Sequence, residues 1–298
     1  MLEFTKLVLG DIHKIKPFFS YSKNMICDNT VGGAFMWRDY FEVEYAIFDD
    51  TVIFKAKVKY HNNVTAFSPP LGKNVKGGFD KIMQYCNAQE LPLVFYNVTS
   101  YDLEILHELF GDYKSLYYED WSDYLYNADD LTSLKGRKFS GQRNHINFFK
   151  KNFEDYSFEV ITENNINEIF EFYRELSLKL QKGGCVFTEE YNKTIEVLEN
   201  FDAYEALGGL IRVNGKVIAF SLGEIVNGVL FVHVEKADIT YRGAYQIINN
   251  EFAKHYCSDD VLFINREEDV GDEGLRAAKK AYHPCRIIDK YIVIPVES

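Results

Sequence analysis

The spacing of apolar residues along the chain changes repeatedly between a period of two and a period of three to four, which predicts alternating strands and helices. In the first half, a turn at Asp49 and Asp50 joins two alternating segments and predicts a hairpin. The predicted strands of this half are residues 2–8, 41–48, 51–58, 64–67, 93–97 and 113–117. Its predicted helices are residues 11–20, 75–88 and 101–110, the last capped by Ser100.

The second half repeats this plan. Asn214-Gly215 and Asn227-Gly228 are two-residue hairpin sequences, and they join three predicted strands in succession. The predicted strands are residues 156–161, 204–213, 216–225, 229–237, 261–265 and 286–295. The predicted helices are residues 165–181, 188–198, 244–256 and 271–282.

Both halves therefore read as strand, helices, three strands, helix, strand, helix and strand, which predicts an α+β fold with one plan used twice. This order of elements resembles the GNAT acyltransferase fold. We predict an N-terminal GNAT-like domain at 1–130, a basic connecting helix at 131–154 and a C-terminal GNAT-like domain at 155–298. Strands 229–237 and 261–265, linked by a helix, should run parallel and then diverge to form a cleft.

Composition narrows the class of protein. Hydrophobic residues make up 47% of the chain and charged residues 26%, as in a globular protein with a packed core. The formal charge of −12 argues against a surface that binds nucleic acid or anionic lipid throughout, and leaves room only for a local basic patch. The sequence has no signal-peptide pattern and no long apolar run, and its five cysteines are scattered. We therefore expect a cytoplasmic protein with reduced thiols and no integral membrane segment.

Residues 135–151 are basic in a chain that is otherwise acidic. They hold six lysines and arginines together with His145, and no acidic residue. As a helix, this segment would present cations and amides to a phosphate group of tRNA, a nucleotide or a lipid head group. An interdomain helix whose charges pair with surrounding acids explains the same pattern. The candidate binding residues of the segment are Arg137, Lys138, Arg143 and Asn144.

Residues 233–246 pass from a strand through Gly243 into a helix, and the free N–H groups of a helix start can bind an anion. The corresponding GNAT loop reads Gln/Arg-x-x-Gly-x-Gly/Ala, whereas Thr240, Gly243 and Tyr245 stand here, which makes coenzyme A binding doubtful. The candidate binding residues are Tyr241, Arg242, Gly243 and Tyr245. His233 and Glu235 alternate on one predicted strand face, either as a hydrogen-bonded pair or as an acid and base.

Residues 265–284 follow a strand, at the end where open sheets place ligands. Carboxylates beside Arg266 suit recognition of an α-amino group or activation of an amine nucleophile, and a capped loop with internal ion pairs is the alternative. The predicted catalytic residues are Glu267, Asp269, His233, Glu235 and Arg266. Further candidates for substrate binding are Asn265, Lys279, Tyr282 and His283.

Four motifs carry a resemblance to a known family. They are Gly-Arg-Lys-Phe-Ser-Gly-Gln-Arg-Asn-His-Ile-Asn-Phe-Phe, His-Val-Glu-Lys-Ala-Asp, Tyr-Arg-Gly-Ala-Tyr-Gln-x-Ile-Asn, and Asn-Arg-Glu-Glu-Asp-x-Gly-x-x-Gly-Leu-Arg-x-Ala-Lys-x-x-Tyr-His-Pro. The chain resembles an uncharacterised bacterial family related to the C-terminal domain of phosphatidylglycerol lysyltransferase and to the Fem aminoacyltransferases. The resemblance implies a tandem GNAT repeat that transfers an amino acid from aminoacyl-tRNA. It also implies that Arg143 belongs to a helix facing tRNA or phosphate, and that Asn265 to Asp269 lie by the acceptor pocket.

The leading hypothesis is an acyltransferase that moves an aminoacyl group from aminoacyl-tRNA to an amine or hydroxyl of a lipid head group or peptide. A coenzyme-A-dependent N-acyltransferase and a non-catalytic nucleotide- or tRNA-binding module stay open. We expect no cofactor, because the donor, aminoacyl-tRNA or acyl-coenzyme A, is itself a substrate. We expect no metal site, since the seven histidines show no ligand spacing. The expected partners are tRNA, through the basic helix, and a small-molecule, lipid head-group or peptide acceptor.

Overall fold

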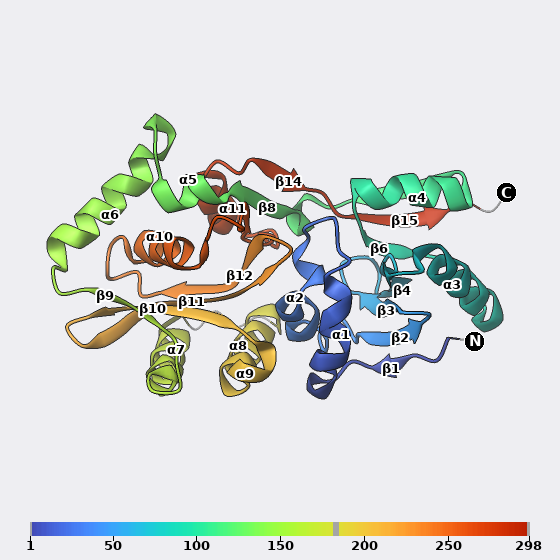
Figure 1. The fold of residues 1–298 in the computed structure, drawn as a ribbon, viewed down its shortest axis with the longest axis horizontal. Coiled ribbons are helices and arrows are strands. Elements are labelled where there is room, and N and C mark those ends of the chain that lie inside the picture. The colour runs from blue at the N-terminus through green and yellow to red at the C-terminus, as the bar shows by residue number, and fades with distance from the viewer. Residues whose placement is uncertain (1, 181–184, 297–298) are drawn as a thin grey trace. The chain divides into compact units, whose positions relative to one another are not determined.

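The computed structural model describes residues 2–180 and 185–296, which form two compact units. Unit 1 comprises Met1–Asp123, Glu268–Gly271 and Ile288–Ser298, and unit 2 comprises Tyr124–Glu267 and Asp272–Ile287. Each unit has its own sheet and helices (Figure 1), and the predicted α+β class is confirmed. Compared with the predicted domain ranges, residues 124–154 belong to unit 2, and residues 268–271 and the last strand of the chain belong to unit 1.

The sheet of unit 1 has the strand order β1-β2-β3-β4-β6-β15-β7, with β5 beside β3. Its strands are β1 (Thr5–Lys6), β2 (Glu44–Phe48), β3 (Thr51–Val58), β4 (Val64–Phe67), β5 (Leu71–Gly72), β6 (Phe95–Val98), β7 (Tyr113–Tyr117) and β15 (Tyr291–Pro295). Its helices are α1 (Ile12–Phe19), α2 (Val31–Met36), α3 (Val75–Gln89) and α4 (Ser100–Phe110), with short 3₁₀ turns at Leu9–Asp11, Cys27–Asn29 and Glu119–Trp121. Buried aromatic rings, Phe79 against Phe95 among them, fill the core between sheet and helices.

The sheet of unit 2 has the strand order β14-β8-β13-β12-β11-β10-β9. Its strands are β8 (Asp123–Asn127), β9 (Ser157–Val160), β10 (Leu207–Val213), β11 (Lys216–Val226), β12 (Val229–Ala237), β13 (Phe263–Asn265) and β14 (Arg286–Ile288). The helices are α5 (Ala128–Ser133), α6 (Ser140–Asn152), α7 (Ile166–Leu180), α8 (Cys185–Glu199), α9 (Phe201–Tyr204), α10 (Ala244–Tyr256) and α11 (Glu273–Lys280), with a 3₁₀ turn at Arg137–Phe139. Helix α10 packs on β10, β11 and β12, and its apolar face completes the core of this unit.

Local sequence signals explain several element ends. Asn214 and Asn227 adopt positive φ before glycines, so the two predicted hairpins of unit 2 are confirmed. Helix α4 begins with a capping box in which Thr99 is the N-cap, rather than Ser100 as predicted. Asp272 caps α11 by accepting a hydrogen bond from the Leu275 N–H.

Two predicted strands differ from the structure. The segment 286–295 forms two strands, β14 in the sheet of unit 2 and β15 in the sheet of unit 1. The predicted strand 2–8 is reduced to β1, whereas β8 and α5 were not predicted.

The predicted parallel pair is confirmed, but β12 and β13 pair only at Val229–Phe231 and Phe263–Asn265. Beyond these residues the ladder ends, which frees the second half of β12 for other contacts.

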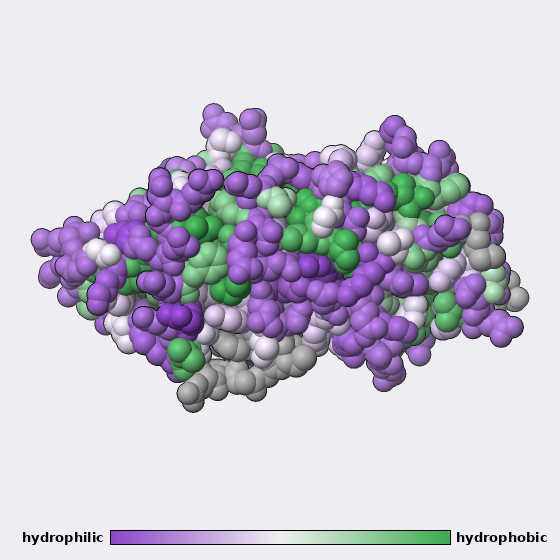
Figure 2. Space-filling model, turned by 90° about the horizontal axis from the view of Figure 1, so that it is seen from below, coloured by the Kyte–Doolittle hydropathy of each residue, from purple (hydrophilic) through white to green (hydrophobic). Residues whose placement is uncertain are grey.

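Among the described helices, none is both long enough and apolar enough to cross a membrane. On the face shown in Figure 2, hydrophilic residues interrupt the hydrophobic ones throughout.

Candidate active site

A β-bulge places His233 in unit 2. Leu222 of β11 pairs with Val234 of β12, and Gly223 pairs with Val232, so His233 is an extra residue in β12. A Cβ atom at residue 223 would lie 2.2 Å from the Phe231 carbonyl oxygen, which explains why glycine stands there. Bulges redirect side chains and occur beside active sites.

The bulge also separates His233 from Glu235. Gly223 faces α10, and side chains alternate along β11, so Glu224 points to the opposite face of the sheet. The His233 ring contacts Glu224, whereas the Glu235 carboxylate accepts a hydrogen bond from Asn249 of α10. The prediction that His233 and Glu235 share a strand face is therefore wrong, because one inserted residue reverses the alternation.

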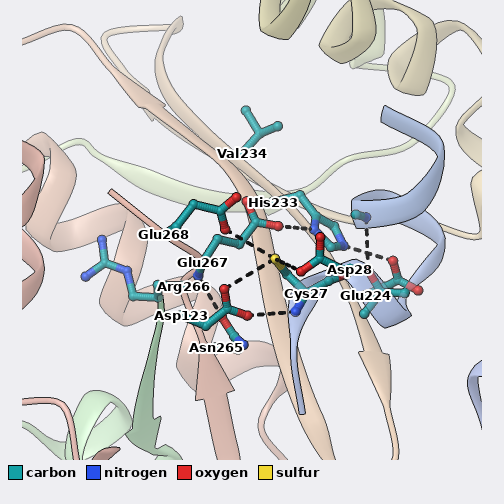
Figure 3. Close-up of polar contacts among 12 residues, drawn as sticks. Cys27, Asp28, Asp123, Glu224, His233, Val234, Asn265, Arg266, Glu267 and Glu268 are labelled. Carbon is teal, nitrogen blue, oxygen red and sulfur yellow. Dashed lines mark hydrogen bonds and ion pairs between the residues drawn. The ribbon is translucent and has the colours of Figure 1, made fainter. Parts of the chain in front are cut away.

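His233 lies between two carboxylates (Figure 3). Its Nδ1 is 2.7 Å from Glu267 Oε1, and its Nε2 is 2.9 Å from Glu224 Oε1. Both ring nitrogens can donate only when the imidazole is protonated. Burial by itself lowers the pKa of His233, but the hydrogen bonds and charges of Glu224 and Glu267 outweigh it and raise the pKa to about 10. His233 is thus a cation at neutral pH.

This raised pKa predicts that unit 2 loses stability in mild alkali. Folded His233 keeps its proton up to a pKa of about 10, and the unfolded residue loses it near the ordinary value of 6.5. The contribution is complete below about pH 6.5 and falls as the pH rises toward 10, by about 2.5 kcal/mol between pH 7 and 9. We expect urea unfolding followed by circular dichroism to show this fall in the wild type and not in His233→Gln. An equal fall in both proteins would contradict the assignment.

Glu235, Arg266 and Asn249 form a second cluster in unit 2. Arg266 Nη2 is 2.9 Å from Glu235 Oε1, and Asn249 Nδ2 is 3.0 Å from Glu235 Oε2. The Arg266 guanidinium also lies over the ring of Tyr282, 4.9 Å from its centroid, and 5.9 Å from the centroid of the Tyr126 ring. These contacts hold the guanidinium in one orientation.

The loop that carries Arg266 and Glu267 is held by two buried side chains. Asn265 Oδ1 accepts a hydrogen bond of 2.7 Å from the Glu267 N–H, and Glu267 has a φ of 58°. Lys279 Nζ donates to the carbonyl oxygens of Arg266 (2.6 Å) and Glu267 (3.1 Å). Asn265 and Lys279, which we predicted to bind substrate, therefore have internal partners that fix the loop. Tyr282, predicted with them, is buried beneath Arg266.

Sequence reasoning missed a buried charged cluster in unit 1. Lys290 Nζ lies 2.8 Å from both Asp28 Oδ2 and Asp123 Oδ1, and 3.6 Å from Glu268 Oε2. Cys27 N donates to Asp123 Oδ2 at 2.7 Å, and its thiol lies 3.3 Å from Glu268 Oε2. Cys27 and Lys290 are 263 residues apart, so no local pattern relates them.

The ligand atoms of Cys27, Asp123 and Glu268 lie within 4.8 Å of one another, close enough to hold a metal ion. The Lys290 ammonium already supplies a cation to these carboxylates. Burial, followed by the charges of Asp123 and Glu268, raises the pKa of the Cys27 thiol well above its usual range, which opposes the thiolate form that a metal needs.

Asp269, predicted as catalytic, lies in unit 1, where its buried Oδ1 accepts a hydrogen bond from the Gly271 N–H.

Comparison with known proteins identifies the family. The profile described as "Phosphatidylglycerol lysyltransferase, C-terminal" matches residues 19–294. The chain belongs to this family. A conserved protein of unknown function from Bacteroides thetaiotaomicron VPI-5482 is 32% identical, and its crystal structure matches with a TM-score of 0.88 over 99% of this chain and 100% of that one.

More distant structures share the fold. L-PGS from Bacillus licheniformis is 16% identical with a TM-score of 0.65 over 96% of this chain and 92% of that one. FemX is 10% identical with a TM-score of 0.62 over 97% and 96%. The chain shares the fold of these two structures, consistent with the predicted pair of GNAT-like domains, and the predicted relation to the lysyltransferase C-terminal domain and the Fem transferases is confirmed. An uncharacterized protein of Mycoplasmoides gallisepticum is 26% identical over 200 residues, 65% of this chain and 59% of that relative's length.

In this member of the lysyltransferase C-terminal family, the basic segment spans the 3₁₀ turn Arg137–Phe139 and most of α6, and two of the predicted binding residues in the segment have internal partners. The Arg143 guanidinium donates to the carbonyl oxygens of Leu134 and Gly136. Lys138 Nζ pairs with Asp130 at 3.0 Å. Arg137 and Asn144 are exposed, and the His283 ring approaches the Lys138 carbonyl oxygen at 3.0 Å.

The start of α10 packs against α6. Gly243 has a φ of 95°, and a Cβ there would lie 2.6 Å from the His145 carbonyl oxygen, so glycine is needed for this close approach. Tyr241 packs its ring on Phe153 at 5.2 Å between centroids. Arg242 lies over the ring of Phe148, and Tyr245 is exposed at the first turn of α10. These contacts are all within unit 2 and leave the role of the segment in binding a phosphate as a prediction.

Proposed function

We propose that this protein is a cytoplasmic aminoacyltransferase that moves an aminoacyl group from aminoacyl-tRNA to an amine or hydroxyl acceptor on a lipid head group or peptide. Family membership supports an acyltransferase in the broad sense. The observation that carries the proposal is the loop at Arg266 and Glu267 after β13, which supplies a carboxylate held by His233 and a guanidinium held by Glu235. An activated ester donor needs those two groups and no covalent nucleophile.

The proton-accepting role falls to Glu267. His233 is already protonated at neutral pH, so it cannot accept the acceptor's proton, and it instead orients the Glu267 carboxylate by its hydrogen bond. The acceptor oxygen or nitrogen attacks the ester carbonyl carbon while its proton passes to Glu267. A bond from the acceptor to carbon forms, the ester C–O bond breaks, and the proton is returned to the leaving ribose oxygen.

The negative charge that develops on the carbonyl oxygen needs a hydrogen-bond donor to stabilise it. Arg266 uses Nη2 for Glu235, whereas Nη1 has no hydrogen-bond partner among the described residues. In the proposed reaction Nη1 donates to this oxygen. A fixed donor in a site from which water is excluded stabilises such charge more strongly than water does, because it needs no reorganisation.

The exposed cations near the start of α6 support a nucleic-acid donor. Arg137 and Lys138 stand in the one basic stretch of a chain with a net charge of −12; both residues are exposed, and Lys138 also pairs with Asp130. A local patch of this kind matches the need to bind phosphates without attracting nucleic acid to the whole surface.

The test is filter binding of bulk charged tRNA over a salt series, beside calorimetry with coenzyme A. We expect saturable tRNA binding. The logarithm of the association constant should fall linearly with the logarithm of the salt concentration. The double variant Arg137→Glu/Lys138→Glu should reduce the slope by about 1 per lost phosphate contact. The matched control is Lys73→Glu/Lys76→Glu in unit 1, which should leave the slope unchanged. Absence of tRNA binding together with coenzyme A binding would overturn the donor assignment.

A further inference from the structure

We infer that Asn249 and Arg266 form a subsite for the α-aminoacyl group of the donor, with the amine donating to Asn249 Oδ1 and the carbonyl oxygen accepting from Arg266 Nη1. This inference rests on the proposed function and adds Asn249 as a residue that determines donor specificity.

The subsite is marked by polar atoms that lack partners. Within residues 2–180 and 185–296, Asn249 Oδ1 and Arg266 Nη1 are buried and have no hydrogen-bond partner. Asn249 is 4% exposed, and the Arg266 side chain is 10% exposed. Buried polar groups are almost always hydrogen-bonded in folded proteins, so two such atoms in one cluster point to a missing group.

The two atoms lie on either side of one carboxylate. Glu235 Oε1 accepts a hydrogen bond from Arg266 Nη2, and Glu235 Oε2 accepts one from Asn249 Nδ2. Each of these two side chains therefore has one polar end fixed by Glu235 and the other end unpartnered. The stacking of Arg266 over Tyr282 and the position of Asn249 within α10 keep both unpartnered atoms in place before a ligand arrives.

The unpartnered atoms have opposite polarity. Arg266 Nη1 can only donate, and Asn249 Oδ1 can only accept. The missing group must therefore both accept and donate. An α-aminoacyl ester carries a carbonyl oxygen that accepts and an amine that donates, two carbon atoms apart, and the Glu235 carboxylate lies beside the position of the amine. An acetyl or other simple acyl group would satisfy Arg266 alone and leave Asn249 buried without a partner.

A site built to pair with an amine rejects the analogue that lacks it. We therefore expect the protein to bind an aminoacyl group about ten to a hundred times more tightly than the corresponding acyl group, the factor that one unpaired buried polar atom produces. The discrimination should depend on Asn249 and not on polar residues elsewhere in α10.

The experiment uses the full chain and small probes. The twenty L-amino acid amides are titrated by NMR or calorimetry, and each amide that binds is compared with its des-amino form, in which hydrogen replaces the amine. The wild type should prefer the amine form at least tenfold, and Asn249→Leu should reduce the preference below threefold.

The matched control is Asn250→Leu. Asn250 is the next residue of α10 and is equally buried at 4%, but its Nδ2 donates to the carbonyl oxygens of Leu131 and Thr132. We expect this variant to lower thermal stability and to keep the preference for the amine.

Three results would overturn the subsite: no amide binds, the wild type binds both forms equally, or Asn249→Leu keeps the full preference. The first two results would mean that an ordered water alone occupies the cluster. Both are measured on the wild-type protein, so they do not depend on whether a variant folds. Transfer from charged tRNA is measured separately. Transfer without amine discrimination would reject the subsite and keep the proposed function. Amine discrimination without transfer would keep the subsite and reject the proposed function.

Discussion

Replacing Lys290 with methionine should lower the free energy of unfolding of unit 1 by about 3–5 kcal/mol. Lys290 Nζ pairs with Asp28 and Asp123 at 2.8 Å each, and the Asp123 side chain is fully buried. Removing the ammonium takes a paired cation away from the buried Asp123 carboxylate beside Glu268, and the loss of a buried ionic partner costs far more than the loss of an exposed ion pair.

The chain offers a direct probe and a matched control for this prediction. Its two tryptophans, Trp37 and Trp121, both lie in unit 1, so tryptophan fluorescence during urea unfolding reports on that unit. Lys76→Met breaks an ion pair with Glu108 whose side chains are 66% and 69% exposed, and should leave the midpoint unchanged. If both variants unfolded at the wild-type midpoint, the buried cluster would carry no stability.

Replacing Glu267 with glutamine should lower the rate of aminoacyl transfer by about 10²–10⁴-fold while donor binding is maintained. Glutamine has nearly the same shape and can still contact His233, but it cannot accept a proton from the acceptor. The loss should therefore appear in kcat, since the ground-state contacts remain.

Hydroxylamine can serve as the acceptor in this measurement while the natural acceptor is unidentified. Formation of amino acid hydroxamate from charged tRNA is followed, with the uncatalysed rate subtracted. Glu273→Gln at the first turn of α11 removes an exposed carboxylate and should leave the rate unchanged. Wild-type turnover in Glu267→Gln would exclude Glu267 as the base, and weaker donor binding alone would assign it to recognition.

The sequence identified much of the site because its residues lie in short motifs. Arg266 and Glu267 are adjacent after a predicted strand, and the structure joins each of them to a predicted residue of β12. Glu224 was not predicted, although it is the single acidic residue of a mostly apolar strand, which is the signal that could have found it. Asp269 was grouped with its neighbours by sequence proximity, yet its side chain is buried in unit 1.

The sequence by itself determined the local elements and the family. Helix periodicity, caps and Asn-Gly turns depend on neighbours within a few residues, so they can be read along the chain. Tertiary structure alone decided three features: the bulge that turns His233 away from Glu235, the division of 286–295 between two sheets, and the ion cluster of Lys290. Each depends on which distant segment a strand pairs with. A shift of one residue in that pairing moves a side chain to the other face, and no local pattern records it.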